Sequence, residues 1–123
     1  MSETLTPAHI EYLNSQFLGR LATVRSDGSP QNNPVGVFYN AELGTIDIGG
    51  YRMGSTRKFR NLADNERVAL VVDDLVSTDP FTPRCLEIRG TAVALRDVEP
   101  PQAGFSREII RIRPERVIAY NID

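Results

Sequence analysis

Three strand-like runs follow one another closely in the first half of this sequence, and turns of hairpin length separate them. Residues 26–30, Ser-Asp-Gly-Ser-Pro, contain the Asp-Gly pair that is typical of a tight turn between two antiparallel strands. The flanking strands are expected at residues 21–24 and 31–39. A second turn at residues 40–44 leads into a third strand at 45–49. This half of the chain therefore predicts antiparallel β-structure.

The second half adds strands of two kinds. Residues 68–72 are apolar at every position, which predicts a central strand covered on both faces. Residues 85–95 alternate, with Leu86 and Ile88 on one face and charged residues on the other, which also predicts a strand. Between the two, residues 73–83 carry acidic and proline-containing turn signals and are expected to form a loop.

The chain is expected to end in two short strands. Ile110 and Ile112 alternate with arginines, Pro114 interrupts the pattern, and residues 117–120 form a last short strand. Residues 98–104, rich in proline and glycine, predict a loop before them.

Two short helices are expected beside these strands. A threonine N-cap and a proline open a helix over residues 7–16, and a second helix is expected from Thr56 to about Asp64. Because strands dominate and the helices do not alternate with them, a doubly wound sheet is disfavoured. We predict a mainly β fold, a small closed barrel of six to seven antiparallel strands with two short helices, as a single domain over residues 1–123.

Composition narrows the function classes. A hydrophobic content of 41% and a charged content of 24% are typical of a soluble globular domain. A net charge of −2 offers no basic field for nucleic acid or an anionic membrane. No apolar run approaches membrane-spanning length, and the polar start does not resemble a signal peptide, so a cytoplasmic protein is expected. With Cys85 as the only cysteine and His9 as the only histidine, no internal disulfide and no two-histidine metal site can form.

The only lysine among the 14 basic residues lies in an unusual run, residues 54–62. Ser55 and Thr56 are candidate N-caps, and Arg57 and Lys58 follow in the first helical turn. Cations are mildly disfavoured there by the helix dipole, whereas a bound anion would remove the conflict. The run alone is as consistent with a solvated amphipathic helix as with a phosphate site.

Four segments together resemble the flavin-binding split-barrel superfamily, that of pyridoxamine 5′-phosphate oxidase. The likeness lies in residues 18–30, in residues 33–37, in residues 56–70 and in residues 85–92. The resemblance implies a split β-barrel that forms a homodimer, with each cofactor bound at the subunit interface. It also implies a small-molecule substrate.

The resemblance implies a role for each candidate residue. Arg57 and Lys58 would bind the cofactor phosphate with the hydroxyls of Ser55 and Thr56. Asn33, Pro34 and Val35 would flank the ring, and Gly49 and Gly50 would let the cofactor approach the backbone. Cys85 would lie near the partner's cofactor. Other roles stay open. The two glycines can simply end a strand, residues 33–35 can be ordinary strand residues, and Cys85 is better explained as a structural thiol than as a nucleophile.

Within the superfamily, the sequence is most similar to small actinobacterial proteins that bind the deazaflavin coenzyme F420, notably over residues 110–120. It lacks tryptophan, and residues 97–106 are shorter than the corresponding insertion of many relatives. The likeness implies an F420-dependent oxidoreductase that transfers a hydride to a small electrophile such as an enone. Arg52 and Arg60 are candidates to meet the anionic tail of the deazaflavin, and solvated surface arginines are the alternative for both. An FMN-dependent oxidase or reductase and a non-catalytic cofactor-binding protein remain the alternatives.

Overall fold

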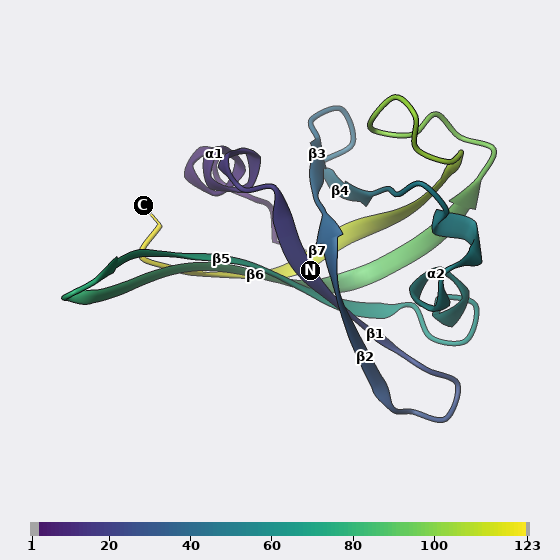
Figure 1. The fold of residues 1–123 in the computed structure, drawn as a ribbon, viewed down its shortest axis with the longest axis horizontal. Coiled ribbons are helices and arrows are strands. Elements are labelled where there is room, and N and C mark those ends of the chain that lie inside the picture. The colour runs from purple at the N-terminus through teal and green to yellow at the C-terminus, as the bar shows by residue number, and fades with distance from the viewer. Residues whose placement is uncertain (1–2, 123) are drawn as a thin grey trace.

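The computed structural model describes residues 3–122 and contains seven strands and two α-helices (Figure 1). The elements are, in chain order, α1 (Pro7–Ser15), β1 (Leu18–Val24), β2 (Pro30–Gly36), β3 (Phe38–Asn40), β4 (Thr45–Ile48), the 3₁₀ turn η1 (Met53–Ser55), α2 (Arg57–Asn61), β5 (Arg67–Thr78), β6 (Phe81–Arg96) and β7 (Glu108–Tyr120). No helix within residues 3–122 is long and apolar enough to cross a membrane.

All seven strands belong to one sheet with the order β2-β1-β5-β6-β7-β4-β3, and each neighbouring pair is antiparallel. The long strands β5, β6 and β7 run along the molecule. The tip of the β5–β6 hairpin lies at one end, α2 lies toward the other, and β3 and β4 lie between them (Figure 1). The predicted mainly β fold, an antiparallel split barrel with two short helices, is confirmed. The expected strand at 31–39 is divided into β2 and β3 at Val37.

The core lies on one face of the sheet. Alternate residues of the strands point into it, as the period-two pattern requires. Its fully buried members include Leu21, Ile46, Ile48, Leu70, Val72, Leu86, Ile88, Ile110 and Ile112. The opposite face of β5 is not fully covered, because Ala69 and Val71 stay half-exposed. The expectation that residues 68–72 are buried on both faces is therefore wrong for this chain taken alone.

The expected loop at residues 73–83 is also wrong, since β5 and β6 form one long hairpin. Pairing continues from Asp73 with Cys85 as far as Thr78 with Phe81. The two aspartates that look like a loop signal have partners on neighbouring strands. Asp73 binds Arg20 at 2.7 Å, and Asp74 binds Arg84 at 2.7 Å.

The C-terminal segment is a single strand that passes through Pro114 without a break. Its register with β6 shifts by one residue, between the pairs Arg89–Arg116 and Gly90–Pro114. A bulge of this kind accommodates a proline that cannot donate to the ladder. A side chain at Gly90 would clash with the carbonyl oxygen of Arg113, so glycine is required at the crossing point. The predicted interruption at Pro114 is a bulge, not an end.

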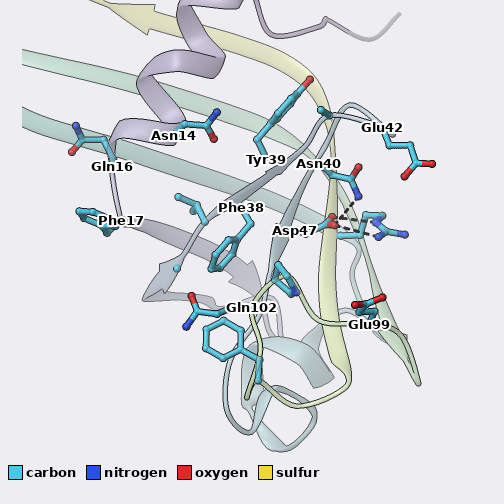
Figure 2. Close-up of a pocket in the computed structure, with 16 residues that line it drawn as sticks. Asn14, Gln16, Phe17, Phe38, Tyr39, Asn40, Glu42, Asp47, Glu99 and Gln102 are labelled. Carbon is cyan, nitrogen blue, oxygen red and sulfur yellow. Dashed lines mark hydrogen bonds and ion pairs between the residues drawn. The ribbon is translucent and has the colours of Figure 1, made fainter.

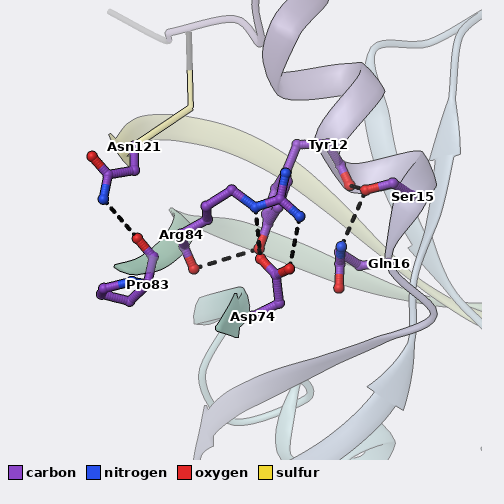
Figure 3. A network of polar contacts seen from close by, with 7 residues as sticks. All are labelled: Tyr12, Ser15, Gln16, Asp74, Pro83, Arg84 and Asn121. Atoms are coloured by element: carbon purple, nitrogen blue, oxygen red, sulfur yellow. Dashed lines mark hydrogen bonds and ion pairs between the residues drawn. The ribbon is translucent and has the colours of Figure 1, made fainter. Parts of the chain in front are cut away.

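Helix α1 is fixed to the long hairpin by a polar cluster (Figure 3). The hydroxyl of Tyr12, which is 4% exposed, donates to Asp74 Oδ1 at 2.7 Å. Arg84 donates to both oxygens of Asp74, at 2.9 and 2.7 Å, and its guanidinium lies 4.9 Å from the centre of the Tyr12 ring. This cluster holds α1 in place, and with it the residues that follow the helix.

Candidate functional site

The predicted phosphate-binding run forms the turn η1 and the short helix α2. Thr56 is the N-cap of α2: its Oγ1 accepts from the N–H of Phe59 at 3.4 Å and donates to the Met53 carbonyl at 2.7 Å. The helix has five residues and ends at Asn61, whereas the sequence predicted an end near Asp64. So short a helix has a weak dipole. Attraction for an anion here must come mainly from side chains.

Four cations lie within residues 52–60, in this helix and just before it. Arg52, Arg57 and Arg60 are exposed and Lys58 is half-buried. Within residues 3–122 none of the four forms an ion pair, because the ion pairs present use Arg20, Arg84, Arg89 and Arg111. Burial lowers the pKa of the Lys58 ammonium. A lysine and arginines without carboxylate partners are donors that suit a phosphate.

Buried contacts fix the far side of α2. Phe59 is 3% exposed, and the Arg96 guanidinium lies 4.9 Å from the centre of its ring. Asn61 is 4% exposed and donates to Thr23 Oγ1 at 2.9 Å and to Gln31 Oε1 at 3.1 Å. Sequence reasoning missed Asn61, although an amide on the buried side of an amphipathic helix is a signal of such a bond.

Residues 33–35 do not share one face of β2. Asn33 pairs with Leu21 and Val35 with Gly19, so both belong to the core side of the sheet. Asn33 also accepts from Gln31 Nε2 at 2.8 Å, which links it to α2 through Asn61. Pro34 is exposed on the opposite face. The three side chains therefore cannot all border the same ring.

The segment before the cations is held by the start of β7. The N–H of Ser106 donates to the Gly50 carbonyl at 2.8 Å, and Ser106 Oγ accepts from the N–H of Met53 at 3.0 Å. Glu108 Oε1 accepts from the N–H of Gly54 at 3.0 Å. These bonds position residues 50–54, and no local signal in the sequence indicates them.

Cys85 lies far from the cations within one chain. It pairs with Asp73 on β5 and Tyr120 on β7. Arg67 is the first residue of β5 and is the end of that strand nearer to α2 in the chain. Asp73 lies six residues further along β5, which corresponds to about 20 Å, so Cys85 lies on the part of the hairpin that extends away from α2 (Figure 1). Burial, and then the carboxylates of Asp73 and Glu87, raise the pKa of the Cys85 thiol. The thiol therefore stays protonated near neutral pH, as expected for a structural cysteine.

A groove of about 980 Å³ opens between the end of α1, the strand β3 and residues 99–105 (Figure 2). None of the predicted site residues lines it. Aromatic side chains do, and Phe105 packs edge-on against Phe38 at 6.0 Å and against Tyr51 at 5.0 Å between ring centres. Since Tyr51 follows Gly50 directly, this aromatic group connects the groove to the segment that precedes the cations.

The groove also contains an ion pair. Arg111 donates to the two oxygens of Asp47 at 3.1 and 3.2 Å, and Asp47 is 6% exposed. Asn40 Nδ2 donates to the same carboxylate at 3.0 Å. The carboxylate is thus saturated by its neighbours, and the pair forms a rigid polar wall.

Residues 5–121 match the family described as pyridoxamine 5′-phosphate oxidase, and the chain belongs to this family. It is 46% identical over 124 residues to the 5a,11a-dehydrotetracycline/5a,11a-dehydrooxytetracycline reductase of Streptomyces rimosus, with 96% of this chain and 84% of the reductase covered. The family predicted from the sequence is confirmed. The likeness to a reductase supports an oxidoreductase function.

Solved structures show the same fold. A conserved hypothetical protein from Mycobacterium tuberculosis superposes with a TM-score of 0.72 at 20% identity, over 98% of this chain and 89% of that one. An F420 reductase superposes with a TM-score of 0.68 at 24% identity, over 93% of this chain and 98% of that one.

The two glycines expected to admit a cofactor have different surroundings. A Cβ on Gly49 would lie 2.8 Å from Phe105 and 3.0 Å from Pro101, so a side chain there collides with the 101–105 segment. A Cβ on Gly50 would meet only Met53, at 3.8 Å. The requirement for glycine at position 49 is explained by packing alone, and the role of either residue toward a cofactor stays a prediction.

We predict that Gly49→Ala lowers the free energy of unfolding by about 1–3 kcal/mol, the usual result of overpacking. Gly50→Ala is the matched control and should change stability little. Thermal or denaturant unfolding of the cofactor-free protein measures both. Equal stability of the two variants would show that the 101–105 segment does not press on Gly49.

Proposed function

We propose that this protein is a coenzyme F420-dependent reductase that transfers a hydride to a small electrophilic acceptor. The observation that carries the proposal is that Arg52, Arg57, Lys58 and Arg60 form no ion pair within residues 3–122. Arg57 and Lys58 would suffice for one phosphate. The deazaflavin carries further negative charges on its lactyl-glutamate tail, and Arg52 and Arg60 would meet these charges at the rim.

The reduced deazaflavin, when bound, supplies the hydride. The protein's part is to bind, orient and shield. Arg57 and Lys58 would hold the phosphate with Ser55 and Thr56, and Ser106 and Glu108 keep the preceding segment in position. Gly49, Gly50 and the β2 residues Asn33 to Val35 would border the ring through their backbone. The second hydrogen of the product would arrive as a proton from water.

We infer the acceptor class from the reductase that is 46% identical to this chain. Its name describes tetracyclines with a double bond between two ring carbons. An acceptor of this kind is a fused-ring molecule whose double bond is conjugated with oxygenated groups. Such a double bond accepts a hydride at one carbon and a proton at the other.

The second candidate function is an FMN-dependent oxidase or reductase. The two cofactors share a tricyclic ring and a phosphate on a ribityl chain, so Arg57 and Lys58 favour neither. The family's description, that of an oxidase, keeps FMN in consideration. A protein that binds cofactor without turnover would have the same phosphate site, and only an assay for turnover separates it.

We expect coenzyme F420 to bind at least tenfold tighter than FMN. Lys58→Ala should weaken binding of both cofactors by roughly 10- to 100-fold, because a charge-assisted contact contributes about 1.5–3 kcal/mol. Arg60→Ala should weaken only F420, by a few-fold and less at high salt. Arg25→Ala, an exposed arginine in the β1–β2 turn, is the matched control.

Titration of each cofactor into the cofactor-free variants gives these dissociation constants. Two results would contradict the assignment. If Arg57→Ala and Lys58→Ala leave both affinities unchanged, the phosphate does not bind here. If FMN binds as tightly as F420, the deazaflavin preference fails and the FMN function takes its place.

We further propose that the protein acts as a homodimer whose subunits each complete the other's cofactor site. The support is the face of the sheet that the core does not use. Val71 pairs with Glu87 and Glu87 with Ile118, which forms a half-exposed row across three strands. Cys85 and Tyr120 form the next row, and Tyr120 is 59% exposed. A partner seated on this face would meet Cys85.

We predict a dimer at micromolar concentration in sedimentation. Val71→Glu should shift the protein toward monomer and weaken cofactor binding, because a buried unpaired charge opposes association. Leu43→Glu, at a residue 55% exposed in the β3–β4 turn, should do neither. A monomeric wild type with cofactor bound at full occupancy would contradict the proposal.

A further inference from the structure

The groove between α1, β3 and residues 99–105 has a charge opposite to that of the cation cluster. Three carboxylates line it, those of Glu42, Asp47 and Glu99, and Arg111 is the one cation among its described lining residues. Asp47 and Arg111 neutralise each other as a pair. Glu42 and Glu99 are exposed, and neither forms an ion pair within residues 3–122. The groove is therefore a poor site for a phosphate or a polyglutamate tail.

The groove has two chemically different ends (Figure 2). Gln16 and Phe17 lie toward one end, and Glu42 and Glu99 lie toward the other. Phe17 is 88% exposed, so its ring is open to contact with a ligand. One end of the groove offers flat aromatic surface, and the other end offers free carboxylates. This arrangement suits an elongated ligand that has rings on one side and a positive charge on the other.

The groove is coupled to the cation cluster through one segment. Phe105 lines the groove and packs on Tyr51, and the next residue, Ser106, binds Gly50 and Met53. A ligand in the groove therefore lies beside the segment that leads to Arg57 and Lys58. Its volume, about 980 Å³, is at the upper end of the range for small-molecule sites.

We propose that this groove binds the acceptor, and that it selects a flat, fused-ring, oxygen-rich molecule bearing an ammonium group. This inference rests on the proposed function. The fused rings lie against Phe17 and Phe38, amides such as Gln102 bind hydroxyl and carbonyl oxygens, and Glu42 and Glu99 attract the ammonium. In the reaction, the acceptor double bond gains a hydride from the reduced deazaflavin and a proton from water, and the deazaflavin leaves oxidised.

The test is equilibrium binding to the cofactor-free protein of two probes, tetracycline and its derivative that lacks the dimethylamino group. We expect tetracycline to bind at least fivefold tighter. The double variant Glu42→Gln/Glu99→Gln should abolish this preference, whereas Phe17→Ala should weaken both probes by a similar factor. Glu115→Gln, an exposed carboxylate outside the groove, is the matched control. All variants should keep the affinity of wild type for F420.

Unchanged tetracycline affinity in both groove variants would overturn the proposal, as would a failure of tetracycline to bind. The proposed function has a separate readout. If wild type reduces dehydrotetracycline with F420 and the groove variants do so with an unchanged KM, the groove assignment is wrong and the function stands. If the variants alter tetracycline binding as expected but no reduction occurs with F420, the groove assignment stands and the function is wrong.

Discussion

The hydrogen bonds between residues 50–54 and the start of β7 are the contacts on which the site depends. Ser106 and Glu108 form hydrogen bonds with backbone groups of Gly50, Met53 and Gly54, and these bonds tie the loop to the sheet. These bonds fix the segment that joins the aromatic group around Phe105 to the start of α2, while Asn61 and Phe59 fix the far side of α2 to the sheet. One short segment thus holds a cationic surface on one side and an acidic, aromatic groove on the other.

The cation cluster is a feature that folding alone does not explain. Lys58 loses part of its hydration on burial, which lowers its pKa, and within residues 3–122 it has no carboxylate to offset that loss. Where other cations of this chain lie against half-buried or buried carboxylates, they form ion pairs, as Arg84 does with Asp74 and Arg111 with Asp47. An unpaired, partly buried cation costs stability, and binding of an anion would remove that cost.

Local signals in the sequence predict much of this fold. The Asp-Gly turn, the alternation of residues 85–95 and the capping threonine of α2 each depend on neighbours in the chain, and each is present in the structure. The failures have a common cause. Asp73 and Asp74 have the composition of a loop, yet arginines on other strands neutralise them. At the Pro114 bulge, Gly90 of β6 leaves space for the carbonyl oxygen of Arg113. In both places, residues that are distant in sequence determine the observed structure.

The same distinction applies to the site. The Arg57–Lys58 run is contiguous and therefore visible in the sequence. The groove is not, because its walls come from the end of α1, from β3 and from residues 99–105, and only the fold brings them together. Among the residues that position the site, Asn61 could have been found as an amide on the buried side of a helix. Ser106 and Glu108 are ordinary polar residues whose role is seen only in their hydrogen bonds.

The most direct test of the account is anaerobic mixing of the protein, reduced F420 and 5a,11a-dehydrooxytetracycline, with both compounds followed by absorbance and chromatography. We predict that oxidised F420 and the reduced tetracycline appear in equal amounts, and that reduced FMN in place of F420 supports little or no turnover. No reduction of the acceptor with either cofactor would contradict the account.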